Sequence, residues 1–367
     1  MTKLQFTELL GLSFQQLATF TEQLGEAPYR ARQLFDGLYR QRWSRLEQFT
    51  TLPAALRQQF VELGISVGTA NVEKKFVSVD GTVRYLLGFA DGQSVETVWM
   101  PEGDGGEAGS DDSDNVADWR RATICVSGQV GCAVDCAFCM TALLGLKRNL
   151  SAGEIVGQIL TVLNDQQADP ERDRINLVFM GQGEPFLNYD NFMQAVRLLV
   201  EGVGIPESRM TVSTSGIVPR IADFGAEPIR PRLAVSLNAP TEALRTHIMP
   251  ITKKWTIDKL MAALREFPLR NRERLTFEYV LLGGVNDGDQ HARDVLELIR
   301  GLRAKVNLIA LNAGPDIPFT TPAEDRVLAF QKILTSAGVP AFIRRPRGRD
   351  IYAACGQLKR TVELVKL

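Results

Sequence analysis

The strongest constraint on the fold is a regular alternation of short apolar runs and amphipathic segments from about residue 119 onward. The apolar runs predict strands at Thr123–Ser127, Asn176–Met180, Met210–Ser213, Leu233–Leu237, Leu275–Leu281 and Val306–Leu311. Helical spacing between and after them covers 151–164, 190–202, 257–266, 289–301 and 322–337. Six consecutive strand–helix units predict an α/β fold with a parallel sheet, either open or closed as a barrel.

Polar residues and cysteines follow the ends of these predicted strands. Chemistry on parallel sheets gathers at the carboxyl ends of the strands, because those ends meet at one edge. The residues found there are Cys132, Cys136 and Cys139 after the first strand, Gly183-Glu184-Pro185 after the second, Ser213 in the third, Ser236 and Asn238 at the fourth, and Asn312 after the sixth. The sequence therefore predicts one site at this edge.

The segment before the first core strand has a different pattern. Residues 1–70 show helical spacing, whereas 71–101 alternate as three short strands with Asp-Gly turn signals between them. We predict a helical accessory domain at 1–70 and a β meander with an acidic loop at 71–118. The core would then span 119–345, and a C-terminal segment 346–367.

Charge is unevenly distributed along the chain. The net charge is −1, yet seven acidic residues and no basic residue fall within 102–118, so the remaining residues carry a net positive charge. That segment is rich in Gly, Ser and Asp, which predicts a flexible, solvated loop. The basic residues cluster at Arg344, Arg345, Arg347 and Arg349, at Lys147-Arg148, at Lys253-Lys254, and at Arg30, Arg32, Arg40, Arg42 and Arg45. Such clusters suit an RNA backbone, although a solvated charged surface gives the same pattern.

The five cysteines point to metal or redox chemistry rather than to a disulfide framework, since their number is odd and no secretion signal is visible. Cys132, Cys136 and Cys139 have the spacing C-x3-C-x2-C. Three thiolates on a short loop suit a four-iron four-sulfur cluster with one open iron, which can bind S-adenosylmethionine (SAM). Two alternatives remain: a zinc site completed by Cys125, Cys355 or a distant histidine, and inert buried cysteines.

With these motifs the chain resembles radical SAM enzymes, and more narrowly the RlmN family of dual-specificity RNA methyltransferases. The motifs that carry the resemblance are Val95-Glu96-Thr97-Val98, Cys125 through Cys139, Gly145 through Leu150, Met180 through Pro185, Ser213 through Gly216, Met249-Pro250-Ile251, Gly284 through Asp287 and Ala353 through Leu358. The resemblance implies a partial (β/α)6 barrel of the TIM type. It also implies methylation of adenine C2, at adenosine 2503 of 23S rRNA and adenosine 37 of tRNAs.

The resemblance also assigns roles to residues. Cys355 would accept a methyl group from one SAM, Cys125 would later resolve the adduct through a transient disulfide, and Glu96 would act as the base. One four-iron cluster would sit on Cys132, Cys136 and Cys139, and a second SAM would be cleaved there. The expected SAM contacts are Gly183, Glu184, Ser213, Ser236, Leu237, Asn238 and Asn312. Without the family, Cys125 would be interpreted as a small core residue and Glu96 as an exposed strand carboxylate.

Some features depart from the family pattern or leave rivals open. Gln182 stands where Met is usual, Met140 where Ser is common, and Asn238 where His is frequent. The rival functions are methylation of adenine C8, as by the related Cfr enzymes, another radical SAM reaction, or a zinc-holding RNA-binding module. The expected partners are RNA (23S rRNA and the tRNA anticodon arm) and a flavodoxin-type electron donor. A cytoplasmic monomer without a membrane segment is expected.

Overall fold

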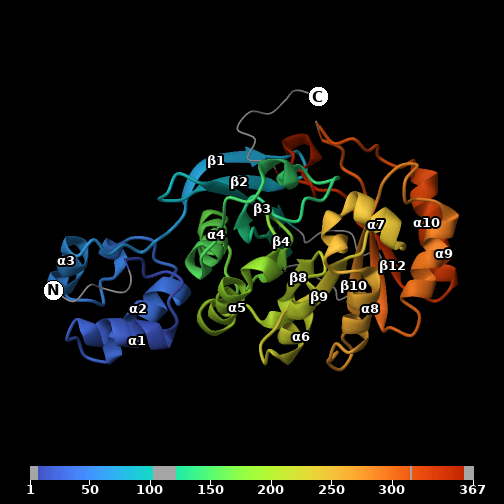
Figure 1. The fold of residues 1–367 in the computed structure, drawn as a ribbon. Coiled ribbons are helices and arrows are strands. Elements are labelled where there is room, and N and C mark those ends of the chain that lie inside the picture. The colour runs from blue at the N-terminus through green and yellow to red at the C-terminus, as the bar shows by residue number, and fades with distance from the viewer. Residues whose placement is uncertain (1–6, 102–120, 315, 359–367) are drawn as a thin grey trace.

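A single large sheet organises the molecule. The computed structural model describes residues 7–101, 121–314 and 316–358 (Figure 1). The strands in sheet order are β1 (Asn71–Val77), β2 (Val83–Gly88), β3 (Ser94–Pro101), β4 (Arg121–Cys125), β7 (Arg174–Phe179), β8 (Met210–Thr214), β9 (Arg232–Ser236), β10 (Leu275–Leu281), β11 (Ala304–Ala310) and β12 (Ala341–Ile343). Neighbours from β4 to β12 are parallel, whereas β1 to β4 pair antiparallel. The strands at the two ends of this order, β1 and β12, are not paired with each other, so the curved sheet is a partial barrel.

The predicted strands are confirmed within a few residues, and the predicted α/β class is confirmed with them. Two differences matter. The meander β1–β3 is not a separate sheet, because β3 pairs with β4 and extends the core sheet. A seventh parallel strand, β12, pairs with β11 and was not predicted, since three residues are too short to show alternation.

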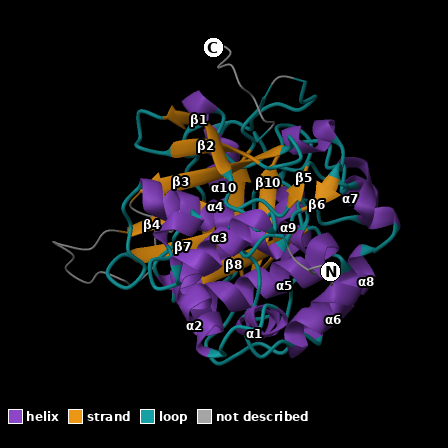
Figure 2. Ribbon diagram, turned by 90° about the vertical axis from the view of Figure 1, so that its left-hand side faces the viewer, coloured by secondary structure: helices purple, strands orange, loops and turns teal. Residues whose placement is uncertain are grey.

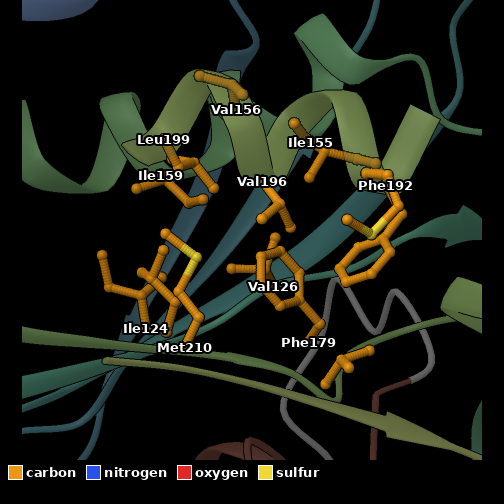
Figure 3. Packing of buried hydrophobic residues seen from close by; sticks show 14 of the residues in the cluster. Ile124, Val126, Ile155, Val156, Ile159, Phe179, Phe192, Val196, Leu199 and Met210 are labelled. Carbon is orange, nitrogen blue, oxygen red and sulfur yellow. The ribbon is translucent and has the colours of Figure 1, made fainter. Parts of the chain in front are cut away.

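Helices pack against the outer face of the parallel strands (Figure 2). They are α4 (Ala152–Asp165), α5 (Tyr189–Leu198), α6 (Val218–Ala226), α7 (Glu242–Ile248), α8 (Ile257–Arg265), α9 (Asp289–Leu298) and α10 (Glu324–Ser336). The short helices α6 and α7 were not predicted. Helix α4 begins at a capping box in which Ser151 and Glu154 satisfy each other's backbone N–H groups. Its apolar face, with Ile155 and Ile159, meets α5 and the strands in the core of Figure 3.

The N-terminal residues fold as a helical unit, as predicted. It contains α1 (Phe14–Gln23), α2 (Tyr29–Phe35) and α3 (Ala54–Glu62), shown in blue in Figure 1. Gln194 of α5 donates a hydrogen bond to the carbonyl of Gly11 at 2.6 Å, and Arg42 donates to the carbonyl of Ala168 at 2.6 Å. These contacts attach the helical unit to the core beside α4 and α5.

Some expectations concern residues that the structure does not describe. The acidic segment 102–118 lies outside the described residues, so its predicted flexibility stays a prediction. The division into four domains likewise stays a prediction. Within the described ranges, no helix combines the length and apolar character needed to cross a lipid bilayer.

Candidate active site

The three motif cysteines lie on the loop that follows β4, at the carboxyl edge of the sheet. The backbone N–H of Val134 donates to Cys132 Sγ at 3.5 Å, and the N–H of Cys139 donates to the carbonyl of Cys136 at 3.0 Å. Phe138 is 9% exposed and belongs to an apolar cluster that Cys136 and Cys139 also contact. An apolar cluster therefore lies against two of these cysteines.

The environment of the motif thiols suits a cationic iron–sulfur group. Burial raises the pKa of Cys132 to about 12, and burial also raises the pKa of Cys136 well above its ordinary value, with the neighbouring motif thiols adding to both effects. Buried thiolates need compensating positive charge, which bound iron supplies as the protons leave. The donor set therefore fits the implied cluster.

The arrangement of the three motif cysteines differs from that of a site for a single metal ion. Among the residues that the structure describes, no three His, Cys, Asp or Glu side chains converge as the ligands of a single metal ion. The thiolates of a four-iron cluster bind different irons, so they need not converge on one point. A zinc site would require rearrangement of this loop.

The two cysteines outside the motif lie together beside this loop. The segment around Cys355 is docked on the motif loop, since the N–H of Met140 donates to the carbonyl of Gly356 at 2.8 Å and the hydroxyl of Thr141 donates to the carbonyl of Leu358 at 2.7 Å. Cys125, at the end of β4, is buried in an apolar cluster with Ile351, Ala353 and Leu358 of the same segment. Residues 230 positions apart in sequence thus share one site.

Cys355 is exposed at the surface, although protein atoms crowd its thiol. Its side chain is accessible, yet so many protein atoms surround the thiol that desolvation raises its pKa. The thiol is within electrostatic range of Cys139 and of Glu278, which adds to the rise, whereas Arg344 opposes it. Burial likewise raises the pKa of Cys125, and the Cys355 thiol contributes to that rise. The accessible thiol therefore lies within reach of both the motif loop and Cys125.

The raised pKa of Cys355 predicts slow alkylation at neutral pH. Because the thiolate is the nucleophile, less of it forms at a given pH when the pKa is raised. We expect the rate of iodoacetamide labelling of Cys355, followed by peptide mass spectrometry, to keep rising above the pH at which a denatured control levels off. Cys125 should label more slowly still, since it is buried. If the labelling rate of Cys355 levels off at or below the pH at which the denatured control does, the pKa of Cys355 is not raised.

Glu96 lies on β3 and is 1% exposed, so its interpretation as an exposed strand carboxylate is wrong. Its carboxylate forms an ion pair with the fully buried Arg84 of β2, and Gln182 Nε2 lies 3.5 Å from its other oxygen. The N–H of Glu96 also donates to Gln182 Oε1 at 3.2 Å. Glu96 is on the same strand face as Val98, which packs with Cys125. The side chain is thus held toward the cysteine site.

The Gly183-Glu184 turn follows β7 and requires its glycine. Gly183 has φ +96°, and a Cβ there would lie 2.5 Å from Cβ of Gln129. Glu184 is 4% exposed, and its carboxylate accepts hydrogen bonds from the N–H groups of Ser215 at 2.7 Å and Phe186 at 3.0 Å. Burial raises the pKa of Glu184, while these two N–H groups oppose the rise. A buried carboxylate of this kind suits the ammonium group of an amino acid.

The other expected SAM contacts gather at neighbouring strand ends. The hydroxyls of Ser213 and Ser236 are 3.2 Å apart, and Asn312 follows β11. Leu237 is fully buried, and its backbone N–H and carbonyl bond to Glu278 and Arg245. Asn238 has φ +58°, and its side-chain oxygen accepts from the N–H of Val280 at 2.8 Å. The structure brings these residues to one edge, and their contact with SAM stays a prediction.

Arg245 is a prominent site residue that the sequence analysis missed. It is fully buried on α7, and its guanidinium donates to the carbonyls of Ser215 at 2.6 Å, Ser236 at 2.9 Å and Leu237 at 3.0 Å. Desolvation lowers its pKa to about 10, opposed by the charge of the Cys136 thiol. A lone arginine on a short helix gives no sequence signal, because its role depends on strand ends that are distant in the chain.

The candidate RNA contacts differ in their availability. Arg148 is held by Asp91 at 2.6 Å and by Glu154 at 2.7 Å, so its charge is engaged within the protein. Lys147, Lys253 and Lys254 are exposed. In the C-terminal cluster Arg345 and Arg349 are exposed, whereas Arg344 and Arg347 are partly buried. Among the N-terminal arginines, Arg32, Arg40 and Arg45 are exposed.

Comparison with known proteins gives consistent matches to both parts of the chain. Residues 126–299 match the Radical SAM superfamily, and residues 7–64 match the ribosomal RNA large subunit methyltransferase N-terminal domain. A probable dual-specificity RNA methyltransferase RlmN of Koribacter versatilis is 70% identical over 346 residues, covering 94% of this chain and 99% of the relative. The dual-specificity RNA methyltransferase RlmN of Solidesulfovibrio magneticus is 43% identical, with 96% of each chain covered.

A solved structure agrees with these sequence matches. A radical SAM methyltransferase from Sphaerobacter thermophilus superposes with a TM-score of 0.87 at 40% identity, covering 97% of this chain and 100% of that chain. The likeness therefore includes the helical unit and the meander as well as the parallel core.

Proposed function

We infer that this chain, which belongs to the RlmN family of radical SAM methyltransferases, methylates RNA at adenine C2 by way of a methyl group carried on Cys355. The family membership makes it an RNA methyltransferase. The proposal adds the position on the base, adenosine 2503 of 23S rRNA and adenosine 37 of tRNAs as targets, and the roles of single residues.

The observation that carries the proposal is the shared environment of Cys125, Cys355 and the motif loop. Adenine C2 is not nucleophilic, so a methyl group cannot be transferred to it by direct displacement from SAM. A carrier thiol near the cluster and a second thiol near the carrier meet this need. Cys355 is docked beside Met140 of the motif loop, and its loop packs around Cys125. A radical enzyme with structural cysteines would not need this juxtaposition.

The implied cofactors fit the residues present. Cys132, Cys136 and Cys139 would hold a four-iron cluster, which when bound supplies the electron that cleaves SAM at its sulfonium. Glu184 would receive the amino group of SAM, since its buried carboxylate lies within electrostatic range of Cys132 and Cys136. The Ser213 and Ser236 hydroxyls would line the remainder of that site. Arg245 fixes the geometry by tying the ends of β8 and β9 together.

The remaining chemistry is assigned to the chain's own side chains. Cys355 loses its proton and takes a methyl group from SAM, which leaves S-adenosylhomocysteine. After that methyl group has lost a hydrogen atom to a cleaved second SAM and its carbon has bonded to adenine C2, Glu96 would remove the C2 proton of this adduct. The Arg84 guanidinium beside Glu96 favours the charged carboxylate, which is the form that can accept a proton. The Cys125 thiolate would then attack Cys355 Sγ, forming the disulfide as the bond from that sulfur to the carrier carbon breaks; the freed carbon would take a proton and remain on the RNA as the C2 methyl group.

The partners follow from this chemistry. The exposed Lys147, Lys253, Lys254, Arg345 and Arg349 would contact the RNA backbone. The target base would leave its stack to reach Cys355, as enzymes acting on bases require. A flavodoxin-type donor would deliver the electrons, and we propose a cytoplasmic monomer because the RNA substrates are cytoplasmic. C8 methylation is the alternative that the same site chemistry could support.

Product mapping tests this proposal. The cluster-loaded enzyme, incubated with SAM and a reductant, should place methyl groups on a 23S rRNA fragment and on tRNA. After digestion to nucleosides, chromatography with mass spectrometry should identify C2-methyladenosine in both. C8-methyladenosine as the product would overturn the C2 assignment, and methylation of one RNA alone would overturn the dual specificity.

A further inference from the structure

The β1–β2 turn contacts the segment that carries Cys355. Asp80 Oδ2 accepts a hydrogen bond from the N–H of Gly348 at 3.0 Å. In the opposite direction, Asp350 accepts from the hydroxyl of Ser78 at 2.5 Å and from the N–H of Val79 at 3.3 Å. Each segment thus supplies a carboxylate to the other. Figure 1 shows this segment, in dark red, beside the β1–β2 hairpin.

The conformation of the segment requires this support. Gly348 has φ +59°, and a Cβ there would lie 2.7 Å from Cβ of Ala353. Tyr352 also has positive φ, at +53°, which costs free energy for a residue with a side chain. A backbone bent in this way needs fixed contacts around it. The paired carboxylates supply them at one end, and the bonds from Met140 and Thr141 supply them at the other.

The meander also packs beneath the segment. Phe76 of β1 lies in the same apolar cluster as Ile351, Ala353 and Cys125. The guanidinium of Arg84 lies 4.1 Å from the centroid of the Phe76 ring, and Arg84 pairs with Glu96. The same three strands therefore support both Glu96 and the Cys355 segment.

We propose that Asp80 and Asp350 form a reciprocal clamp that positions Cys355 between the motif loop and Cys125, so that both are positioning residues for the methyl transfer. The proposal rests on the proposed roles of Cys355 and Cys125. Because both ends of the Cys355 segment are held by hydrogen bonds, the Cys355 thiol moves within a small volume that contains the motif loop and Cys125. Releasing one end would enlarge this volume and reduce the fraction of time that Cys355 spends near Cys125.

Disulfide formation between Cys125 and Cys355 measures how often the two thiols meet. The cluster-loaded protein is equilibrated anaerobically with reduced and oxidised glutathione. The two thiols give up two electrons and two protons to glutathione disulfide, which yields the Cys125–Cys355 disulfide and two molecules of glutathione. Peptide mass spectrometry measures the linked fraction, and iron content shows that the motif cysteines remain ligated. The equilibrium constant is the effective concentration of one thiol at the other.

The expected result is a drop of about tenfold in this constant for Asp80→Ala/Asp350→Ala, as for the loss of hydrogen bonds to charged groups. Asp350→Ala alone removes an exposed side chain and should show a smaller drop in the same direction. With RNA, the double variant should also form more 5′-deoxyadenosine per methyl group transferred. A variant that was only less stable would lose both products in proportion.

Asp91→Ala is the matched control. Asp91 occupies the other Asp-Gly turn of the meander and accepts the N–H of Gln93 at 3.0 Å, as Asp80 accepts the N–H of Thr82 at 2.9 Å. Its loss should leave the disulfide constant unchanged. If the wild type forms the disulfide and the clamp variants match it, the clamp is overturned. If the wild type forms none, the proposed pairing of Cys125 with Cys355 fails instead.

Discussion

Cys355→Ala should abolish RNA methylation while the protein keeps its iron and its fold. The side chain is accessible and small, so its removal leaves the apolar cluster around Cys125 intact. Without the thiol there is no acceptor for the first methyl group, and a rate loss on the order of a thousandfold or more is expected, as for removal of a covalent nucleophile. The measurement is methylated adenosine formed per enzyme, with iron content and thermal unfolding recorded for the same sample.

Cys125→Ala distinguishes the role of Cys355 as the methyl carrier from the role of Cys125 as the resolving thiol. This variant should still methylate Cys355, which intact-protein mass spectrometry detects as one added methyl group. Since no second thiol can attack Cys355, a covalent protein–RNA adduct should accumulate and be visible on a denaturing gel. The variant that carries both Cys125→Ala and Cys355→Ala should show no adduct. An adduct in Cys355→Ala, or full turnover in Cys125→Ala, would contradict the assigned roles.

The parallel core was predictable because its signals are local. Buried strands such as Leu275–Leu281 are short apolar runs, and helix α4 begins at a capping box that is visible in the sequence. The strand β12 and the helices α6 and α7 are short, and their placement depends on packing against neighbours. The sequence also could not show that β3 pairs with β4, because residues 102–120 separate the two strands and so long a connection carries no hairpin signal.

The site was predictable where a motif carries the chemistry. The spacing of Cys132, Cys136 and Cys139 and the Gly183-Glu184 turn are local features of single loops. The partners of those residues are not local. Arg84 meets Glu96 across a strand pair, and Arg245 reaches the ends of two parallel strands. Asp80 and Gly348 are 268 positions apart, so no local pattern could reveal their hydrogen bond.

Gln182 stands where the family usually has Met, and its contacts in the structure explain the difference. Gln182 is fully buried, and its side-chain amide exchanges hydrogen bonds with the backbone N–H and the carboxylate of Glu96. Methionine at this position could fill the space but could not donate to the carboxylate. In this chain the amide therefore adds a polar contact that restrains Glu96.

Cys136→Ala should yield protein without its cluster and without activity. Cys136 lies between the other two motif cysteines, packs in the apolar cluster around Phe138, and interacts electrostatically with both of their thiols. Two thiolates cannot replace the three that the cluster requires. Purified under anaerobic conditions, the variant should contain little iron or sulfide, and RNA methylation should fall on the order of a thousandfold or more, as when a catalytic group is removed.

The matched control for this prediction is Cys125→Ala, which also removes one cysteine thiol at the same edge of the sheet. Because Cys125 lies outside the three-cysteine motif and is assigned to the resolution step, its loss should leave iron and sulfide at wild-type amounts. Equal iron loss in both variants would place Cys125 among the cluster ligands and leave no open iron for SAM. Wild-type iron in Cys136→Ala would remove the motif from the cluster altogether. The two variants together therefore assign each thiol to metal binding or to methyl transfer.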